Sequence, residues 1–418
     1  MIKRIVLIAI LAVLLGCCFI GIKKHHAQSN TEKKFTFWSI QLNEAYKEKM
    51  ENIISNFKKT HPDYTFVWVD IPIQEAQKRT LASILSSTPP DLINLNADFS
   101  QILVQKNALE YFSEKDAKDF LPALVNKLRH NGKIFALPYN ATSPVTIYNK
   151  EIWQECTHQP FIKTYDELYF ISDRLKVCSG IPSYTANLNE NDTLLKILNK
   201  YDITNFKTQE EKASLINIYS MFNEMYKKDY MPKDTLTINH REMVEKYMSN
   251  QALVIVPGSN FIKIIKSDAP DIYKKSAIAP QLVGKNGKYD VSLMNLIIPK
   301  KAQNKKLALE FALLLTNKEN QLDLSKTTNV LSVNKYALQD DYFKNCSSDL
   351  EEQARCESAK QLSNLVENKV QIANKKALTD LLNKTLEEIL LNENSCLDTI
   401  KARIEHYFPH LNSLIEQN

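Results

Sequence analysis

The sequence predicts an α/β fold with mainly parallel sheets flanked by helices, followed by a helical C-terminal region. The first observation is an alternation of strand and helix patterns between residues 35 and 95. The second is the length of 418 residues, 44% of them hydrophobic, which can bury sizeable cores and fits two or three compact units. The third is a helical periodicity from residue 369 onward.

The first residues have the parts of a secretory leader. Lys3 and Arg4 are positive, and residues 5–15 are apolar throughout. An apolar run of this length is shorter than the roughly 20 residues that span a bilayer. The run therefore predicts a signal peptide that ends close to residue 16.

The four residues LLGC at positions 14–17 resemble a bacterial lipobox, in which the cysteine sulfur takes a diacylglycerol before cleavage. We expect residues 1–16 to be a signal peptide and Cys17 to be the lipidated first residue of the mature chain. Residues 17–34 would then be a flexible tether between the lipid and the folded domain. From residue 22 onward this segment is polar and lacks periodicity. The alternative is an uncleaved membrane anchor in which Cys17 and Cys18 have no special role.

The folded part begins with alternating strands and helices. A strand at 35–40 precedes a helix whose apolar residues are spaced between 42 and 57. A second strand at 64–69, a second helix at 73–85 and a third strand at 91–95 follow. This order is typical of a parallel sheet with helices on its faces.

The remaining elements are further apart in the chain. Thr164 and Glu167 fit a capping box and predict the start of a helix. We expect further strands at 134–137, 145–148, 252–256 and 295–299, and helices over much of 194–248 and at 304–316.

The net charge argues against a nucleic-acid partner. The chain carries 53 Lys and Arg against 48 Asp and Glu, a formal charge of +5. Loss of Lys3 and Arg4 with the leader leaves 5 − 2 = +3. Because the lysines are mixed with acidic residues along helix faces, they indicate a solvated surface and not a basic groove.

The seven cysteines fit an oxidising compartment, where disulfides persist. Without Cys17 and Cys18, five remain, so at least one thiol stays free. The disulfide candidates are Cys346 with Cys356, ten residues apart, and then Cys156 with Cys178; no CxxC motif occurs.

Motifs for chemistry are mostly absent. The seven glycines cannot assemble GxGxxG or GxxxxGK, and GxSxG and HExxH are missing. The eight histidines are scattered, so we expect neither a cofactor nor a metal site. An enzyme stays open as the alternative, because the two carboxylates of a glycoside hydrolase leave little local pattern.

Aromatic, amide and acidic side chains stand near the ends of the predicted strands. Ligands of open α/β sheets bind beyond the carboxyl ends of the strands. Aromatic faces can cover the C–H patches of a sugar, while amides and carboxylates bind its hydroxyls. Each residue has the alternative of a buried aromatic or a turn amide. The candidates are Trp38, Asn94, Asn96, Asp98, Tyr139, Asn140, Asn260, Phe261 and Asn295.

In order and spacing the chain resembles the family 1 extracellular solute-binding proteins, relatives of maltose-binding protein. Phe37 and Trp38 end the first strand, as in that family. The other matching pieces are FKKTHPDYTF at 57–66, PPDLINL at 89–95 before Asp98, GKIFALPYNATSPVTIYNK at 132–150, VIVPGSN at 254–260, SDAPDIYKKSAIAP at 267–280 and the late strand, helix and return at 295–333.

The resemblance implies a two-lobed periplasmic-binding-protein-like fold of type II, with a hinge and the ligand in the cleft. We expect lobe one at 35–141 plus 293–317, lobe two at 142–292 plus 318–418, and crossings between them near 140–144, 291–294 and 316–320.

The resemblance also implies a function. The chain would be an extracytoplasmic lipoprotein, in the periplasm or on the cell surface, that captures a small solute and delivers it to an ABC-type importer. We expect a sugar or oligosaccharide as ligand, permease subunits as partners, a lipid anchor as the sole membrane attachment, a monomer, and no catalytic residue. The family's ligand positions fall on Trp38, Asp98, Tyr139, Ser259 and Asn260, with Phe261 near the place of a frequent stacking tryptophan. The alternative is a lipid-anchored surface enzyme such as a glycoside hydrolase.

Overall fold

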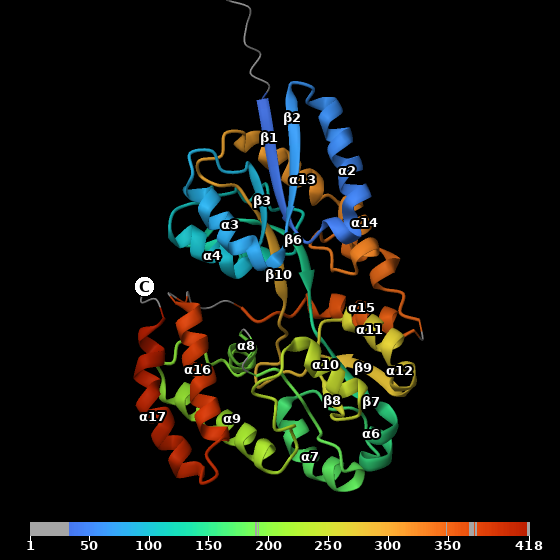
Figure 1. Ribbon diagram of the computed structural model, residues 1–418, viewed down its shortest axis with the longest axis vertical. Helices are drawn as coiled ribbons and strands as arrows, with labels where there is room; N and C mark the ends of the chain where they lie inside the picture. The colour runs from blue at the N-terminus through green and yellow to red at the C-terminus, as the bar shows by residue number, and fades with distance from the viewer. Residues whose placement is uncertain are drawn as a thin grey trace, which may run out of the picture.

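The protein has two lobes, one above the other in Figure 1. The computed structural model describes residues 33–188, 190, 192–347, 349–367, 372 and 374–415. The expected signal peptide, the lipidation site Cys17 and the tether up to residue 32 lie outside the described residues. Lys33 and Lys34, expected in the tether, already belong to the first strand. No helix in the described part of the chain is long and apolar enough to cross a membrane.

Lobe one is built on a five-stranded mixed sheet in the order β2-β1-β3-β10-β6. Strand β1 is parallel to β2 and β3, whereas β10 is antiparallel to β3 and β6. The antiparallel pair follows from the path of the chain, because β6 leads out of the lobe and β10 leads back into it. The strands are β1 (Lys33–Ile40), β2 (Tyr64–Ile71), β3 (Leu92–Asn96), β6 (Leu137–Thr142) and β10 (Ser292–Ile297), with a separate β4 (Arg129–His130) and β5 (Lys133–Ile134) ribbon.

Helices cover both faces of this sheet. Phe35 and Phe37 are buried and contact Phe311 of α13, with ring centroids 5.7 and 5.5 Å apart. On the opposite face, the Arg79 guanidinium of α3 lies 5.7 Å from the ring of Trp38. Strand β1 therefore alternates between two helix-covered faces. The helices of lobe one are α2 (Asn43–Thr60), α3 (Ile73–Leu85), α4 (Ala97–Gln105), α5 (Pro122–Asn126), α13 (Lys305–Leu315) and α14 (Lys318–Thr328), with short 3₁₀ turns η1 (Ala337–Gln339) and η2 (Asp341–Phe343).

Lobe two has a three-stranded sheet in the order β8-β7-β9. The prediction of a mainly parallel sheet is wrong for this lobe, because β7 is antiparallel to both neighbours. The reason lies in the connections: β7 leaves the junction of the lobes and β9 returns to it, so the two strands run in opposite directions. The strands are β7 (Val145–Asn149), β8 (Val254–Ile255) and β9 (Ser276–Pro280).

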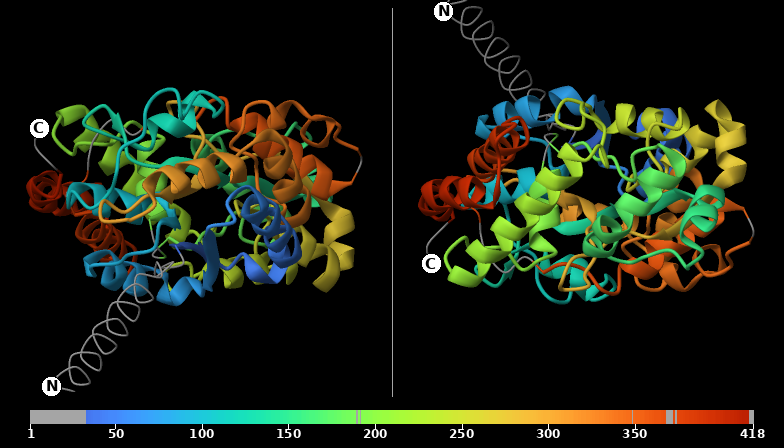
Figure 2. Two further views of the ribbon diagram at one scale, coloured as in Figure 1. Left: turned by 90° about the horizontal axis from the view of Figure 1, so that it is seen from above. Right: turned by 90° about the horizontal axis from the view of Figure 1, so that it is seen from below.

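Helices supply most of lobe two. Seen from above and from below, α16 and α17 lie at one end of the molecule and α12 at the other (Figure 2). The predicted helical C-terminal region corresponds to α16 and α17, whose apolar side chains join a core with α8 and α9. The helices are α6 (Lys150–Thr157), α7 (Tyr165–Ser179), α8 (Thr193–Asn199), α9 (Gln209–Lys227), α10 (His240–Met248), α11 (Phe261–Asp268), α12 (Pro270–Lys275), α15 (Leu350–Gln361), α16 (Lys375–Leu390) and α17 (Leu397–Ser413).

The chain crosses between the lobes between β6 and β7 and between β9 and β10, close to two of the expected positions. The expected crossing at 316–320 lies inside lobe one instead. Leu324, Leu331 and Val333 are buried in the core of lobe one, and the next crossing comes between η2 and α15. Residues 318–343, expected in lobe two, thus pack in lobe one, because their apolar side chains cover the same sheet.

A hydrogen-bond network joins the crossings. The Ser143 hydroxyl donates to the Asp290 carbonyl at 3.0 Å and accepts from the Gln281 and Gln361 amides at 3.1 Å each. The Ser358 hydroxyl donates to the Ser143 carbonyl at 2.8 Å, and the Gln361 side-chain oxygen accepts from the Gln281 backbone at 2.8 Å. Buried side chains from three separate segments therefore hold the junction together.

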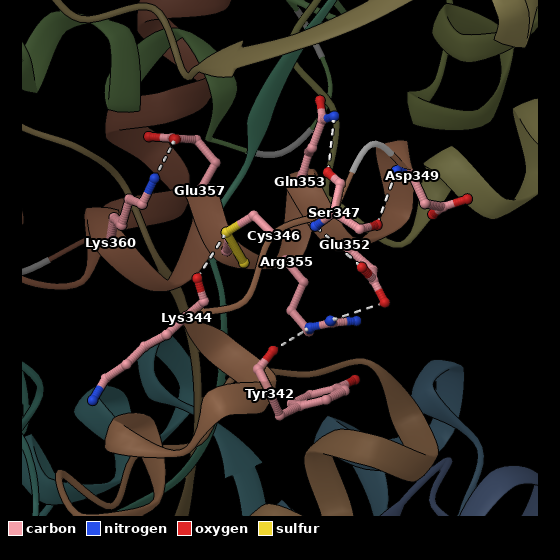
Figure 3. Close-up of a disulfide and its surroundings, with 11 residues drawn as sticks. Tyr342, Lys344, Cys346, Ser347, Asp349, Glu352, Gln353, Arg355, Glu357 and Lys360 are labelled. Atoms are coloured by element: carbon pink, nitrogen blue, oxygen red, sulfur yellow. Dashed lines mark hydrogen bonds and ion pairs between the residues drawn. A yellow bond between two sulfur atoms is a disulfide. The ribbon is translucent and has the colours of Figure 1, made fainter.

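Both expected disulfides, Cys156–Cys178 and Cys346–Cys356, are present, and Cys396 is an exposed free thiol. Figure 3 shows the second disulfide, which ties the late crossing to α15. Beside it, Arg355 of α15 donates to the Tyr342 carbonyl at 2.7 Å, and its guanidinium lies 3.9 Å from the Tyr342 ring. Because the Tyr342 ring packs against the core of lobe one, this cluster fastens α15 to lobe one.

Candidate functional site

A cavity of about 340 Å³ opens at the junction of the lobes. Its walls come from lobe two and from the two earlier crossings. A volume of this size is at the lower end for small-molecule sites. The lining residues are Thr142, Pro144, Tyr165, Tyr184, Ala186, Asn187, Asp192, Thr193, Lys196, Ile197, Lys200, His240, Met243, Val256, Gly258, Asn260, Phe261, Gln281, Asp290 and Ser292.

The first residues of four helices line this cavity. They are Tyr165 of α7, Thr193 of α8, His240 of α10 and Phe261 of α11. Local sequence sets two of these helix starts, because Thr164 before α7 and Asn239 before α10 each form a complete capping box. The fold of lobe two thus brings four distant helix starts to one place.

Aromatic rings form part of the wall. The rings of Tyr165 and Tyr184 meet edge to face with centroids 6.0 Å apart, and those of His240 and Phe261 lie 4.7 Å apart. Burial raises the pKa of both tyrosines, so their hydroxyls stay neutral. Burial also lowers the pKa of His240, so its imidazole is uncharged at neutral pH. The aromatic wall therefore carries no net charge.

Asp192 directly precedes α8 and lies between two lysines. Its carboxylate contacts Lys196 at 3.0 Å and Lys375 at 2.7 Å. Burial alone would raise the pKa of Asp192, but the two ammonium groups outweigh it and lower the pKa to about 2. Asp192 is therefore ionised and neutralised by its partners.

Lys200 is a buried lysine in the lining of the cavity. Its side chain is 2% exposed and contacts the Asp290 carboxylate at 3.1 Å. It also donates to the Gln281 side chain and to the Leu282 carbonyl, both at 2.8 Å. Gly284 lies close behind, where a Cβ atom would come within 2.6 Å of the Lys200 carbonyl oxygen. The pair of Lys200 and Asp290 thus links lobe two to the second crossing.

The loop after β8 carries an amide toward the cavity. A Cβ atom on Gly258 would lie 2.6 Å from the Asn260 side-chain oxygen, so a larger residue at position 258 would displace this amide. Asn260 precedes α11 without forming a capping hydrogen bond from its side chain. Its exposed amide can therefore contact a ligand.

A second cavity of about 510 Å³ lies on the side of α4 and α16. Asp192 lines both cavities, so its carboxylate stands at their boundary. Basic groups are frequent here, yet Lys375 is paired with Asp98 at 2.8 Å and Arg129 with Glu114 at 2.7 Å. The lining residues include Asp98, Gln101, Gln105, Lys106, Lys127, Arg129, Asp192, Asn199, Glu367, Lys375 and Lys376.

Of the residues proposed from the sequence, Asn260 and Phe261 line the first cavity and Asp98 the second. Ser259 lies beside Asn260 in the same loop. Among the described residues that line the two cavities, Ser259 is absent. The structure thus brings the late loop to the cavity, with Phe261 against His240.

Other candidates have structural roles in lobe one. The Asn96 side chain caps α4 by accepting from the Phe99 amide at 2.8 Å. Trp38 is half-buried between the core and Arg79, and Asn140 is half-buried in β6 opposite Met294. Within the described residues, none of these three lines either cavity.

Tyr139, Asn295 and Asn94 are buried inside lobe one and do not face the cleft. Tyr139 is 1% exposed, and burial raises the pKa of its hydroxyl. Asn295 is fully buried and accepts from Ser100 at 2.8 Å. The amide of Asn94 donates to the Asn295 carbonyl at 3.1 Å. Asn94 and Asn295 lie on the inner strands β3 and β10, whereas Tyr139 lies on the edge strand β6. Among the described residues, the Tyr139 hydroxyl and the Asn295 amide nitrogen are buried without a hydrogen-bond partner.

The sequence interpretation missed the polar groups that lobe two supplies. Tyr165, Asp192, Lys200, His240 and Asp290 were not among the candidates. One of these residues could have been found from the sequence. The predicted capping box at Thr164 marks the start of α7, and Tyr165 is the first residue of that helix. Across the described ranges, no group of three or more His, Cys, Asp or Glu side chains could hold a metal ion.

Comparisons with known proteins agree with this architecture. The sequence profile of a family described as bacterial extracellular solute-binding protein matches residues 52–347. The arabinooligosaccharide-binding protein of Bacillus subtilis is 23% identical over 329 residues, which cover 73% of this chain and 74% of that protein.

Solved structures show the same two-lobed fold. The sugar-binding protein MalE of Xanthomonas citri superposes with a TM-score of 0.73 at 17% identity, covering 91% of this chain and 98% of that one. The GacH receptor of Streptomyces glaucescens, solved without ligand and with acarbose, gives 0.69 at 18% identity, covering 91% and 99%.

Proposed function

The chain belongs to the family of bacterial extracellular solute-binding proteins, and on this premise we propose that it captures an uncharged sugar or oligosaccharide and delivers it to an ABC-type importer. Members of this family bind solutes outside the cytoplasm. The proposal concerns the ligand class, the cavity that holds it and the delivery to membrane permease subunits.

The balance of charge in the first cavity carries this proposal. Lys196 and Lys200 are matched by Asp192 and Asp290, each within 3.1 Å of its partner. An ionic ligand would have to break one of these pairs, whereas a neutral polyol need not. Aromatic rings and the free Asn260 amide offer the apolar faces and hydrogen bonds that a sugar requires.

The relatives support the same ligand class. The curated relative in Bacillus subtilis is named for arabinooligosaccharides, and the solved structures are named for sugars or acarbose. A cavity of about 340 Å³ has room for a short saccharide.

The enzyme alternative has less support from the cavity. The acid of a glycoside hydrolase needs a raised pKa. Asp192 has the opposite shift, to about 2, because Lys196 and Lys375 outweigh its burial. The Asp290 carboxylate is held by Lys200 at 3.1 Å.

A panel of oligosaccharides incubated with the purified protein tests the proposal. We expect stoichiometric thermal stabilisation by one ligand class without any product, because a receptor binds its ligand and leaves it unchanged. Product formation detected by chromatography would support the enzyme instead. Stabilisation by charged solutes alone would contradict the neutral-ligand proposal.

Replacing Phe261 with Ala is expected to weaken ligand binding about tenfold. Loss of an aromatic contact of this kind costs on the order of 1–3 kcal/mol, and each 1.4 kcal/mol is about a factor of ten in Kd. Calorimetric titration with the best ligand of the panel measures the effect. Phe170→Ala is the matched control, since Phe170 is 78% exposed on α7 and lies outside the cavity lining. Equal affinities for the two variants would remove Phe261 from the site.

The cellular arrangement is also part of the proposal. We infer an extracytoplasmic monomer, attached to the membrane by lipid on Cys17 and not by a spanning helix. The sequence at residues 14–17 supports the lipid attachment, and the family's description supports the extracytoplasmic location.

A further inference from the structure

Lys375 reaches from lobe two to a carboxylate of lobe one. It is the first residue of α16, and its ammonium group lies 2.8 Å from Asp98 Oδ2 and 2.7 Å from Asp192 Oδ2. Asp98 belongs to α4 of lobe one, whereas Asp192 precedes α8 of lobe two. One side chain therefore bridges acidic groups from both lobes.

The bridge continues into a chain of alternating charges. The second oxygen of Asp192 contacts Lys196 at 3.0 Å, so the order is Asp98, Lys375, Asp192 and Lys196. The four groups carry no net charge together. Because Asp192 lines both cavities, this chain of charges borders the candidate sugar site.

Burial differs along the chain of charges. The side chains of Asp192 and Lys375 are 15% and 30% exposed, whereas that of Asp98 is 66% exposed. Burial alone would lower the pKa of Lys375, but Asp98 and Asp192 outweigh it and raise the pKa. If the lobes separate, Asp98 returns to water while Lys375 keeps Asp192. The contact between Asp98 and Lys375 can therefore form and break without stranding a buried charge.

We propose that Asp98, Lys375 and Asp192 form an ionic latch that favours contact between the lobes when no solute is bound. The latch goes beyond solute capture, since it acts on the empty protein. An ion pair with one exposed partner changes a two-state ratio by up to about fivefold. Salt weakens it, because the Debye length falls from about 10 Å at about 0.1 M to about 3 Å at about 1 M.

Hydrogen exchange of the full chain without ligand tests the latch. We expect Lys375→Met and Asp98→Asn each to raise amide exchange in α4 and α8, by up to about fivefold, at about 0.1 M salt. The difference from the unmodified protein should shrink at about 1 M salt, where the pair is screened. If Lys375 only packs against its neighbours, the rise in amide exchange in α4 and α8 should be the same at both salt concentrations.

Lys376→Met is the matched control, because Lys376 is the next residue of α16 and pairs with Asp380 on an exposed surface, 84% and 61% exposed. It should leave exchange in α4 and α8 unchanged. Equal exchange in the unmodified protein and in Lys375→Met, or an equal rise in the control, would overturn the latch.

Two further results of the hydrogen-exchange experiment distinguish the latch from other causes of faster exchange. If Lys375→Met only frays α16, exchange rises in residues 375–390 but not in α4, and the latch is rejected. Asp98→Asn changes an exposed residue of the other lobe, so a matching rise in α8 supports the latch independently. Since no solute is present, this result does not depend on whether the protein binds a sugar.

Discussion

Replacing Lys200 with Met is expected to lower the free energy of unfolding by about 3 kcal/mol. The substitution keeps an unbranched side chain, one atom shorter, but removes the partner of Asp290, whose side chain is 14% exposed. It also removes the donor to Gln281 and to the Leu282 carbonyl. Breaking one half of a buried ion pair is costly because the other half stays desolvated without compensation. Urea titration followed by tryptophan fluorescence measures the change.

Lys285→Met provides the comparison for this prediction. Lys285 pairs with Glu210 at 3.1 Å, but the side chains are 67% and 79% exposed. Its loss should change stability by less than about 0.5 kcal/mol. The double variant Lys200→Met with Asp290→Asn should recover part of the lost stability, because it removes the unpaired charge. If the double variant is no more stable than the single one, the unpaired carboxylate is not the cause.

Replacing Cys17 with Ser is expected to release the protein from membranes almost completely. Serine offers no sulfur for a diacylglycerol, and two acyl chains supply roughly 0.8 kcal/mol per buried CH₂. Fractionation of cells into membrane and released material, with detection of the protein in each, measures the shift. The proposed leader at residues 1–16 is unchanged in this variant and should still direct export.

Cys18→Ser is the control for this prediction, because it changes the neighbouring thiol and leaves the lipobox intact. It should remain with the membrane fraction. A Cys17→Ser protein that also remains there would favour the uncleaved anchor, and the lipoprotein proposal would have to be given up.

Local patterns predicted much of lobe one. Alternating burial along β1 and the strand and helix order up to β3 appear where the sequence indicated them. The same alternation did not reveal which side chains reach the cleft. Tyr139 and Asn295 stand on strands of the predicted sheet, yet helices cover both faces there and both side chains are buried.

The site itself depended on contacts that no local pattern contains. Phe261 and Asn260 were predicted, but Asp192, Lys200 and Asp290 acquire their partners only when distant segments meet. Charged side chains occur throughout the chain, so the sequence offers many possible pairs and no means to choose among them.

The sequence by itself determined features that depend on neighbours a few residues apart: the capping box at Thr164 and the alternation of β1. The leader at residues 1–16 stays a prediction. Only the tertiary structure decided the strand directions of lobe two, the late crossing after η2 and the bridge from Asp98 to Lys375. The physical reason is the range of the interactions. Caps and alternation arise from hydrogen bonds and side-chain directions within one element, whereas strand direction and ion pairing depend on how separate elements pack.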